Sequence, residues 1–238
     1  MIITYIKKII NKSYYSYLYW KTNKLHNKKY VEKYILDKKY KFIQGSIREY
    51  NDYDDSWLLF LSSNAEIVFD VGCNIGQSSL LISYSNTLKK LLLIEPNPMA
   101  LSIASENLII NNLSENAIFI PKAAYNKSGK KIKLWTLLGE NNQAASLDSS
   151  FAKTGKNANS YFEVETITLD KIAEKYNYYP DLVKIDVEGV EFSVLEGSIN
   201  IAKKNKTKFI VEVHSSNTLS IIKNTEQILA WAKQNNYD

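Results

Sequence analysis

Short apolar runs alternate with longer, helix-compatible segments along the chain from about residue 65 onward. The runs are rich in Val, Ile, Leu and Phe, and they lie at residues 66–71, 91–95, 117–121, 182–187 and 208–213. Strands that alternate with helices in this way are typical of a parallel sheet that helices cover on both faces. The pattern therefore predicts an α/β fold with a mostly parallel sheet.

One stretch of the chain departs from this alternation. Residues Lys131 to Leu137 and Phe162 to Thr168 alternate between polar and apolar side chains, which predicts an antiparallel pair of strands. The connection between them, Leu138 to Tyr161, is polar and long for a compact domain, and such loops are commonly functional. We interpret this connection as a candidate lid over a binding site.

The first 50 residues differ in composition from the rest of the chain. They contain 12 lysines and arginines against three acidic residues, a net charge of +9, whereas the whole chain carries +5 and the remainder therefore −4. Isoleucines at positions 2, 3, 6, 9 and 10 recur at helical spacing beside lysines. We predict a basic, helical N-terminal appendage over residues 1–50 and a second domain over residues 51–238. Two interpretations of the appendage stay open: peripheral contact with a membrane surface or another anionic partner, or a solvated helix without a partner.

Length and composition favour a globular protein with one main core, since 45% of the 238 residues are hydrophobic. The sequence contains no run of about 18 apolar residues, so we expect no transmembrane helix. The single cysteine, Cys73, cannot form an internal disulfide, and no signal peptide is evident. We predict a cytoplasmic protein, with contact at the inner face of the membrane as an alternative.

A glycine turn follows the first apolar run of the predicted sheet. Residues 67–71 lead directly into Gly72 and Gly76, and a helical pattern begins shortly afterwards. Glycines at this position allow a ligand to approach the start of a helix. The third glycine of the dinucleotide fingerprint is missing, and Asp70 would repel a pyrophosphate but attract a cationic ligand such as S-adenosylmethionine. A turn that merely joins strand and helix, without any ligand, is the alternative.

The second apolar run ends in Glu95, about 20 residues after the glycine turn begins. A carboxylate at this place can accept hydrogen bonds from both ribose hydroxyls of a nucleoside. The alternative role for Glu95 is to cap the helix that begins at Pro98. Asn97 is the better cap for a helix with proline at its first position, so we predict that Glu95 is left for the ligand.

Acidic residues and a histidine follow the fourth and fifth apolar runs. Asp186 and Glu188 share one face of the fourth predicted strand, and His214 follows the fifth strand on the same parity as Glu212. Ligands bind at the carboxyl ends of the strands in open α/β sheets. His214 is a candidate general base there, and a divalent cation such as Mg²⁺ bound by Asp186, Glu188 and His214 is the alternative. Helix capping by the two carboxylates and a loop position for His214 are the structural alternatives.

The ordered set of these motifs resembles the FkbM-type methyltransferases. The resemblance covers roughly residues 50–235 and rests on Asp70-Val-Gly-Cys-Asn-Ile-Gly76, Ile94-Glu-Pro-Asn-Pro98, Ala123-Ala124, Thr168-Leu-Asp170, Lys184-Ile-Asp-Val-Glu-Gly189 and Val211-Glu-Val-His214. It implies a Rossmann-like class I methyltransferase fold with S-adenosylmethionine as cofactor. It further implies O-methylation of a hydroxyl group on a sugar, glycan, glycolipid or natural product.

The resemblance also assigns roles to individual residues. Asp186, Glu188 and His214 are expected to line the acceptor site. Cys73 takes a place that is often alanine in the family and is expected to lie beside the cofactor as a small residue, not as a nucleophile. The remaining residues that the resemblance implies for cofactor binding are Asp70, Gly72, Asn74, Gly76, Glu95 and Asn97, with the adenine near Ala123 and Ala124.

Three rival functions remain. A nicotinamide oxidoreductase is disfavoured by the missing glycine and by Asp70. A nucleic-acid methyltransferase is disfavoured because the carboxylates of Asp186 and Glu188 would repel a phosphate backbone, so we expect no nucleic-acid partner. A catalytically inactive module that binds S-adenosylmethionine is the third.

The C-terminus departs from the pattern of this class, which usually continues with an antiparallel hairpin after the fifth strand and its helix. Leu219 to Gln234 predicts that helix, and only four residues follow it. We therefore expect the strand at residues 209–213 at or near a sheet edge. A truncated chain, coverage of the edge by the N-terminal segment, and a homodimer are the three explanations we consider.

Overall fold

We describe the protein from a computed structural model, which describes residues 30–48, 53–136, 145–146, 160–204, 206–214 and 218–237. The chain divides into two compact units, Met1–Ile47 and Arg48–Asp238, and each is described by itself. The predicted domain boundary, between residues 50 and 51, falls in the stretch 49–52 outside the described residues.

The described part of the first unit is a β-hairpin. Strands β1 (Tyr30–Ile35) and β2 (Lys38–Ile43) pair antiparallel, with Tyr30 opposite Ile43 and Ile35 opposite Lys38. Exposed side chains alternate with less exposed ones along β1, and Tyr40 and Phe42 of β2 are buried on either side of exposed Lys41, a period of two that suits a strand. Residues 30–43 therefore correct the prediction of a helical appendage, whereas the isoleucine and lysine pattern of residues 2–12 lies outside the described residues.

The second unit is built on a five-stranded parallel sheet with strand order β11-β10-β3-β4-β5. The strands span Ile67–Val71 (β3), Lys90–Ile94 (β4), Ala117–Ile120 (β5), Leu182–Ile185 (β10) and Lys208–Val211 (β11). Each strand coincides with one of the predicted apolar runs. The central strands are apolar on both faces because helices bury both faces, and the prediction of a mostly parallel α/β sheet is confirmed.

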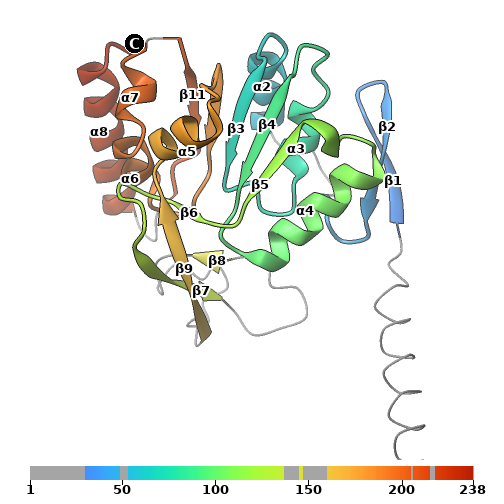
Figure 1. Cartoon of the computed structure of the whole chain (residues 1–238), viewed down its shortest axis with the longest axis horizontal. Helices are drawn as coiled ribbons and strands as arrows, with labels where there is room; N and C mark the ends of the chain where they lie inside the picture. Colours follow the sequence, from blue (N-terminus) through green and yellow to red (C-terminus); the bar gives the residue numbers. More distant parts are fainter. Residues whose placement is uncertain are drawn as a thin grey trace, which may run out of the picture. The chain divides into compact units, whose positions relative to one another are not determined.

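Helices cover the two faces of this sheet. They span Tyr53–Ser62 (α2), Gln77–Ile82 (α3), Pro98–Ile110 (α4), Leu169–Tyr176 (α5), Glu191–Glu196 (α6), Ile199–Ala202 (α7) and Thr218–Gln234 (α8), with a short 3₁₀ turn at Ser114–Asn116 (η1). Figure 1 shows α6, α7 and α8 together on one side of the sheet and α3 and α4 on the other. One continuous core joins Phe69, Leu92 and Val183 of the sheet to Ile172 of α5 and Trp231 of α8.

A smaller sheet of order β6-β9-β7-β8 follows the third strand of the main sheet. Its strands span Ala123–Ala124 (β6), Lys131–Thr136 (β7), Ala145–Ser146 (β8) and Ser160–Ile167 (β9). Strands β7 and β9 pair antiparallel, as the alternating pattern predicts. Strands β6 and β8 have two residues each and are too short to leave a periodic pattern. Most of the predicted lid lies outside the described residues.

Strand β11 lies at one edge of the main sheet. Within the described part of the chain it pairs with β10 alone, and α8 matches the helix predicted for residues 219–234. Phe209 of β11 packs edge-on against Trp231 of α8 at 5.3 Å between ring centroids. The edge position is as predicted, and the three explanations offered for it stay predictions.

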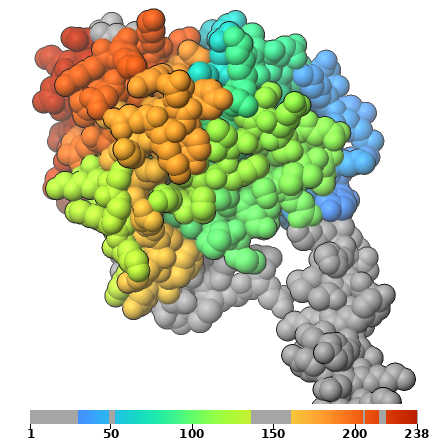
Figure 2. All heavy atoms as spheres, viewed as in Figure 1, coloured from blue at the N-terminus to red at the C-terminus, as the bar shows by residue number. Residues whose placement is uncertain are grey.

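Atoms of the α4 and α5 segments lie at the surface in the face of the second unit that Figure 2 shows. None of the described helices combines the length and the apolar character that a crossing of a bilayer requires.

Candidate functional site

A cavity of about 330 Å³ lies at the carboxyl ends of β3, β10 and β11. Its volume falls within the range of small-molecule sites, and its position is the one where open α/β sheets bind ligands. Charged residues line much of it: Arg48, Asp54, Asp55, Lys184, Asp186 and Glu212. Of the residues predicted for the cofactor, Gly72, Cys73 and Asn74 reach the cavity wall.

The glycine turn brings backbone segments close together. A Cβ atom on Gly72 would lie 1.8 Å from the carbonyl oxygen of Asp186, and one on Gly76 would lie 2.9 Å from Cα of Ala104. Both glycines, and Asn74 between them, have positive φ angles of 75°, 84° and 48° respectively. The close packing of β3 against β10 at Gly72, and of α3 against α4 at Gly76, therefore explains why glycine is needed at both positions. Their contact with a ligand stays a prediction.

Asp70 is buried at the end of β3, where it is bound by the protein itself. Its Oδ2 accepts hydrogen bonds from the hydroxyls of Ser78 at 2.7 Å and Ser79 at 2.6 Å, in the first turn of α3. Its Oδ1 lies 3.9 Å from Nζ of Lys184. The cation opposite Asp70 in this structure is thus a lysine of the chain, and Asp70 is not part of the cavity lining.

Glu95 ends β4 as a buried carboxyl group held in one orientation. Its Oε2 accepts a hydrogen bond from the backbone N–H of Asn74 at 3.0 Å, and its Oε1 accepts one from that of Asn97 at 2.8 Å. Burial raises the pKa of Glu95 to about 7, although these two hydrogen bonds act in the opposite direction. The carboxyl group is therefore tied to the glycine turn and has lone pairs left for a hydroxyl donor.

Three other predicted cofactor residues lie close to the turn or in the core. The side chain of Asn97 caps α4 by accepting a hydrogen bond from the backbone N–H of Met99 at 3.0 Å, so the predicted cap is confirmed. Ala123 and Ala124 form β6, and both are buried. Contact of these three residues with a cofactor stays a prediction.

Cys73 is buried beside the glycine turn. Burial raises the pKa of its thiol well above the ordinary value, and the charges of Asp70 and Glu95 raise it further. The thiol is therefore neutral at physiological pH, and a neutral buried thiol is a poor nucleophile.

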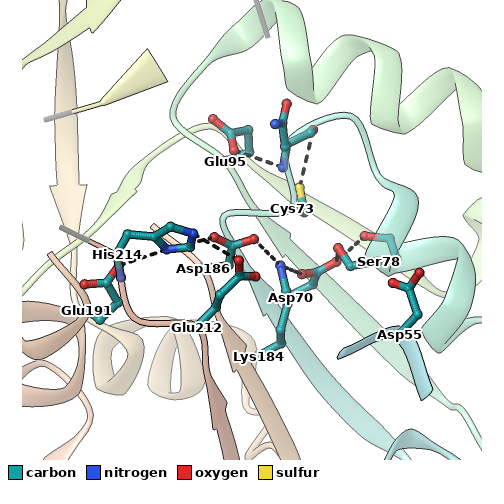
Figure 3. A network of polar contacts seen from close by, with 12 residues as sticks. Asp55, Asp70, Cys73, Ser78, Glu95, Lys184, Asp186, Glu191, Glu212 and His214 are labelled. Atoms are coloured by element: carbon teal, nitrogen blue, oxygen red, sulfur yellow. Dashed lines mark hydrogen bonds and ion pairs between the residues drawn. The ribbon is translucent and has the colours of Figure 1, made fainter. Parts of the chain in front are cut away.

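A chain of charged side chains crosses the carboxyl end of the sheet, as Figure 3 shows. Nζ of Lys184 donates to Oδ2 of Asp186 at 3.0 Å, and Oδ1 of Asp186 lies 3.6 Å from Nδ1 of His214. Nε2 of His214 lies 3.0 Å from Oε1 of Glu212, and Nδ1 lies 3.5 Å from Oε1 of Glu191. The imidazole ring is thus surrounded by three carboxylates, and the structure brings predicted Asp186 and His214 together.

These carboxylates change the charge state of the histidine. The contacts of Glu191 and then Glu212 raise the pKa of His214 to about 10 against the opposing effect of partial burial, and the charges of Glu188 and Asp186 add to the increase. His214 is therefore an imidazolium at neutral pH. Burial by itself would lower the pKa of Lys184, but the neighbouring Asp70 and Asp186 raise it, so Lys184 is also a cation.

Several residues of this network were not among the predicted site residues. Lys184 and Glu212 lie on the same faces of their strands as the predicted residues Asp186 and His214. The alternation of side chains along each strand was the only sign in the sequence that they belong to the site. Glu191 belongs to the first turn of α6 and looks there like an ordinary N-terminal acidic residue. The sequence gives no signal for Arg48, whose guanidinium binds Asp55 at 2.7 Å.

The ligand atoms of Asp186, Glu212 and His214 lie within 4.8 Å of one another, and within the described part of the chain this is the group that could hold a metal ion. It contains Glu212 in the place of Glu188, which was the predicted third ligand. Glu188 instead lies in the turn after β10, where its φ angle is 55°.

The sequence model of the methyltransferase FkbM domain matches residues 70–238. The chain belongs to the FkbM methyltransferase family. The predicted resemblance is thereby confirmed, together with the Rossmann-like methyltransferase fold that it implied. None of the curated proteins matches the chain.

Solved structures similar to the chain include other methyltransferases. The methyltransferase FkbM from Methylobacillus flagellatus KT is 19% identical at a TM-score of 0.45, and the match covers 68% of this chain and 36% of that one. TYW2 from M. jannaschii, in complex with AdoMet, is 16% identical at a TM-score of 0.47, and the match covers 88% of this chain and 74% of that one. The chain therefore spans about a third of the length of the Methylobacillus enzyme.

Proposed function

We propose that this chain transfers the methyl group of S-adenosylmethionine to a hydroxyl oxygen of a sugar, glycan, glycolipid or natural product. The observation that carries the proposal is the charged cavity at the carboxyl ends of β3, β10 and β11, in a chain of the FkbM methyltransferase family. The glycine turn forms one wall of this cavity, and the Lys184, Asp186 and Glu212 side chains form another.

The residues around the glycine turn fit the proposed cofactor. When bound, S-adenosylmethionine supplies an electrophilic methyl group on a sulfonium. Glu95 is suited to the ribose hydroxyls, because two backbone N–H groups fix its carboxyl group and hydroxyl donors would satisfy its remaining lone pairs. The carboxylates of Asp54, Asp55, Asp186 and Glu212 at the cavity would offset the positive charge of the sulfonium.

A hydroxyl acceptor must lose its proton during the transfer, and the network offers a group for it. His214 is protonated at neutral pH and cannot accept this proton, which favours Asp186 over the predicted histidine as the proton acceptor. Asp186 lines the cavity, and the cations of Lys184 and His214 hold its two oxygens in place. We infer that His214 acts by fixing Asp186 and Glu212.

The cavity lining supports a neutral, hydroxyl-rich acceptor. Carboxylate and guanidinium groups make strong hydrogen bonds to hydroxyls, and the Arg48 and Asp55 pair lines the same cavity as Asp186. The same carboxylates would repel the phosphates of a nucleic acid. We therefore maintain the proposal of a small-molecule or glycan acceptor.

A divalent cation is the second candidate for the chemistry of this network. Asp186 and Glu212 provide two carboxylate oxygens, the ligand type that suits Mg²⁺ or Mn²⁺, and His214 adds one nitrogen, a ligand type that suits metals such as Zn²⁺ or Fe²⁺. A histidine must be neutral to bind a metal, so the cation and the imidazolium proton exclude each other. Mg²⁺ titrated into chelator-treated protein should therefore release a proton on binding. A calorimetric heat that does not depend on the ionisation enthalpy of the buffer would contradict the metal proposal.

Two measurements test the proposed activity. By calorimetry the protein should bind S-adenosylhomocysteine more tightly than NAD, and Glu95→Ala should weaken that binding while the exposed control Glu174→Ala leaves it unchanged. Labelled cofactor should then transfer its methyl group to an acceptor in glycan and glycolipid extracts. Tighter binding of NAD, or an unchanged affinity in Glu95→Ala, would refute the cofactor assignment.

The acceptor side is tested by Asp186→Asn and His214→Asn. Both variants should keep S-adenosylhomocysteine affinity within a few-fold of wild type and lose about 10²-fold or more in turnover. The wild-type rate should persist from neutral pH upward and fall as His214 loses its proton near pH 10. A rate that instead rises through pH 6 to 7 would return the role of general base to His214.

A further inference from the structure

Glu191 is a buried carboxylate that contacts His214 in the charged network but does not line the cavity. Its side chain is 0% exposed, and it lies in the first turn of α6. Buried carboxylates are rare unless several donors satisfy them. Its hydrogen bonds therefore indicate what the residue holds in place.

The first group that Glu191 binds is the turn after β10. Its Oε1 accepts a hydrogen bond from the backbone N–H of Gly189 at 2.8 Å. Glu188 and Gly189 have φ angles of 55° and 102° in this turn. Consecutive positive φ angles persist only where the surroundings determine them, so the contact with Glu191 stabilises the turn that begins at Asp186.

The second group is the segment after β11. Oε1 of Glu191 also lies 3.4 Å from the backbone nitrogen of His214, which donates to it, and 3.5 Å from Nδ1 of the same residue. Its Oε2 accepts a hydrogen bond from Nδ2 of Asn224 on α8 at 2.7 Å. The amide of Asn224 is also 3.5 Å from the carbonyl oxygen of His214. One carboxylate thus joins the ends of two neighbouring strands and the last helix.

We propose that Glu191 is a positioning residue that sets the distance between Asp186 and His214 and fixes the orientation of the imidazole ring. The proposal rests on the proposed function for its catalytic meaning, because Asp186 and His214 are the acceptor-side residues of that function. Glu191 itself touches neither the cavity nor, therefore, the acceptor. Its Oε1 faces Nδ1 of His214 and accepts from the backbone N–H groups of Gly189 and His214, while its Oε2 accepts from the side chain of Asn224.

A capping carboxylate of α6 would make the contact with Gly189 but would have no effect on the imidazole ring. Glu191→Gln separates these roles, because it keeps an acceptor for the N–H of Gly189 and removes the charge opposite Nδ1. A rotation of the Asn224 side-chain amide by 180° would allow its Oδ1 to accept a hydrogen bond from the new amide group of the glutamine. The matched control is Glu196→Gln on the same helix, where Oε2 accepts from Asn126 at 2.9 Å away from the network.

The experiment is carried out on the 238-residue chain with S-adenosylhomocysteine as the probe. The ¹⁵N chemical shifts of the His214 ring are recorded at a single pH of 7.5, and the chain has only two histidines, so a His214→Asn spectrum assigns them. Amide exchange at Gly189 and His214 is measured in parallel. Calorimetry with S-adenosylhomocysteine shows whether the cofactor side is intact.

We expect Glu191→Gln to move the ring shifts and to speed exchange at the two amides by roughly ten-fold or more, as for a weakened hydrogen bond to a charged group. Affinity for S-adenosylhomocysteine should stay within about two-fold, as weak coupling between separate sites would give. Glu196→Gln should leave the ring shifts unchanged.

Unchanged ring shifts in a folded Glu191→Gln protein would overturn the proposal. If that variant does not fold, Asn224→Ala replaces it, and unchanged ring shifts there have the same meaning. Absence of methyl transfer in the wild type would refute the proposed function. The ¹⁵N shifts of the His214 ring would still test whether Glu191 positions that ring.

Discussion

The buried carboxyl group of Glu95 links the proposed ligand site to folding stability. Its pKa of about 7 in the native chain is above the ordinary value of 4.5, so the native state retains a proton that the unfolded chain releases. The stabilisation that Glu95 contributes is therefore complete below pH 4.5 and is lost as the pH rises through 7. On the scale of 1.4 kcal/mol for each unit of pKa, the loss is on the order of 3 kcal/mol.

This effect predicts a difference between the ligand-free wild type and Glu95→Gln. Between pH 5 and pH 8 the free energy of unfolding should decrease more in the wild type, because the variant has no titrating group at this position. Urea denaturation of both proteins at the two pH values measures the difference. The contributions of the other titrating groups are the same in both proteins and therefore cancel. Parallel pH dependences in the two proteins would show that Glu95 does not hold this proton.

Part of the local structure around the site was predictable from the sequence. The cap of α4 by Asn97 was predicted and is confirmed, whereas the binding of Asp70 by the hydroxyls of Ser78 and Ser79 was not predicted. Such contacts depend on where a strand end meets a helix start in three dimensions. The raised pKa of His214 also depends on Glu191, whose distance from the ring the sequence does not contain.

At the level of elements, predictability followed the length and burial of each element. The five parallel strands consist mainly of apolar residues, so each leaves a nearly continuous apolar run in the sequence. The hairpin of β1 and β2 lies in a segment rich in lysine and tyrosine, where composition obscured the period of two. Strands β6 and β8 are held by pairing with β9 and β7 and have no pattern of their own.

Gly76 provides a test of how the glycine turn joins α3 to α4. Gly76→Ala should destabilise the protein through its φ angle of 84° and through overlap with Ala104 at 2.9 Å. Gly129→Ala is the matched control, because its φ angle is 80° and a Cβ there meets nothing within 4 Å. The control measures the backbone strain of about 1 kcal/mol or more, and Gly76→Ala should exceed it by the cost of the overlap, about 1–3 kcal/mol.

Urea denaturation of these two variants gives the comparison directly. Equal losses of stability would mean that α3 and α4 adjust without cost and that Gly76 is required only for its backbone angle. A stable Gly76→Ala protein that no longer binds S-adenosylhomocysteine would instead assign this glycine to the ligand.

On the scale of the whole molecule, charge is distributed unevenly along the chain. The first 50 residues carry a net charge of +9 and the remainder −4. The candidate site lies within the unit Arg48–Asp238. The residues that line the cavity begin at Arg48, so the function of residues 1–29 can be tested separately from methyl transfer.

The basic residues 1–29 can be tested for binding to an anionic membrane surface. Residues 1–29 contain seven lysines and no acidic residue, and each lysine near an anionic membrane surface contributes about 1 kcal/mol of attraction. The 238-residue protein should therefore pellet with vesicles that contain phosphatidylserine at low salt and be released at high salt, because salt screens the attraction. A chain without residues 1–29 should remain in the supernatant and bind S-adenosylhomocysteine as the full chain does. Replacement of Lys7, Lys8 and Lys12 by glutamine should give an intermediate result, whereas equal pelleting of all three proteins would show that the segment does not bind anionic lipid.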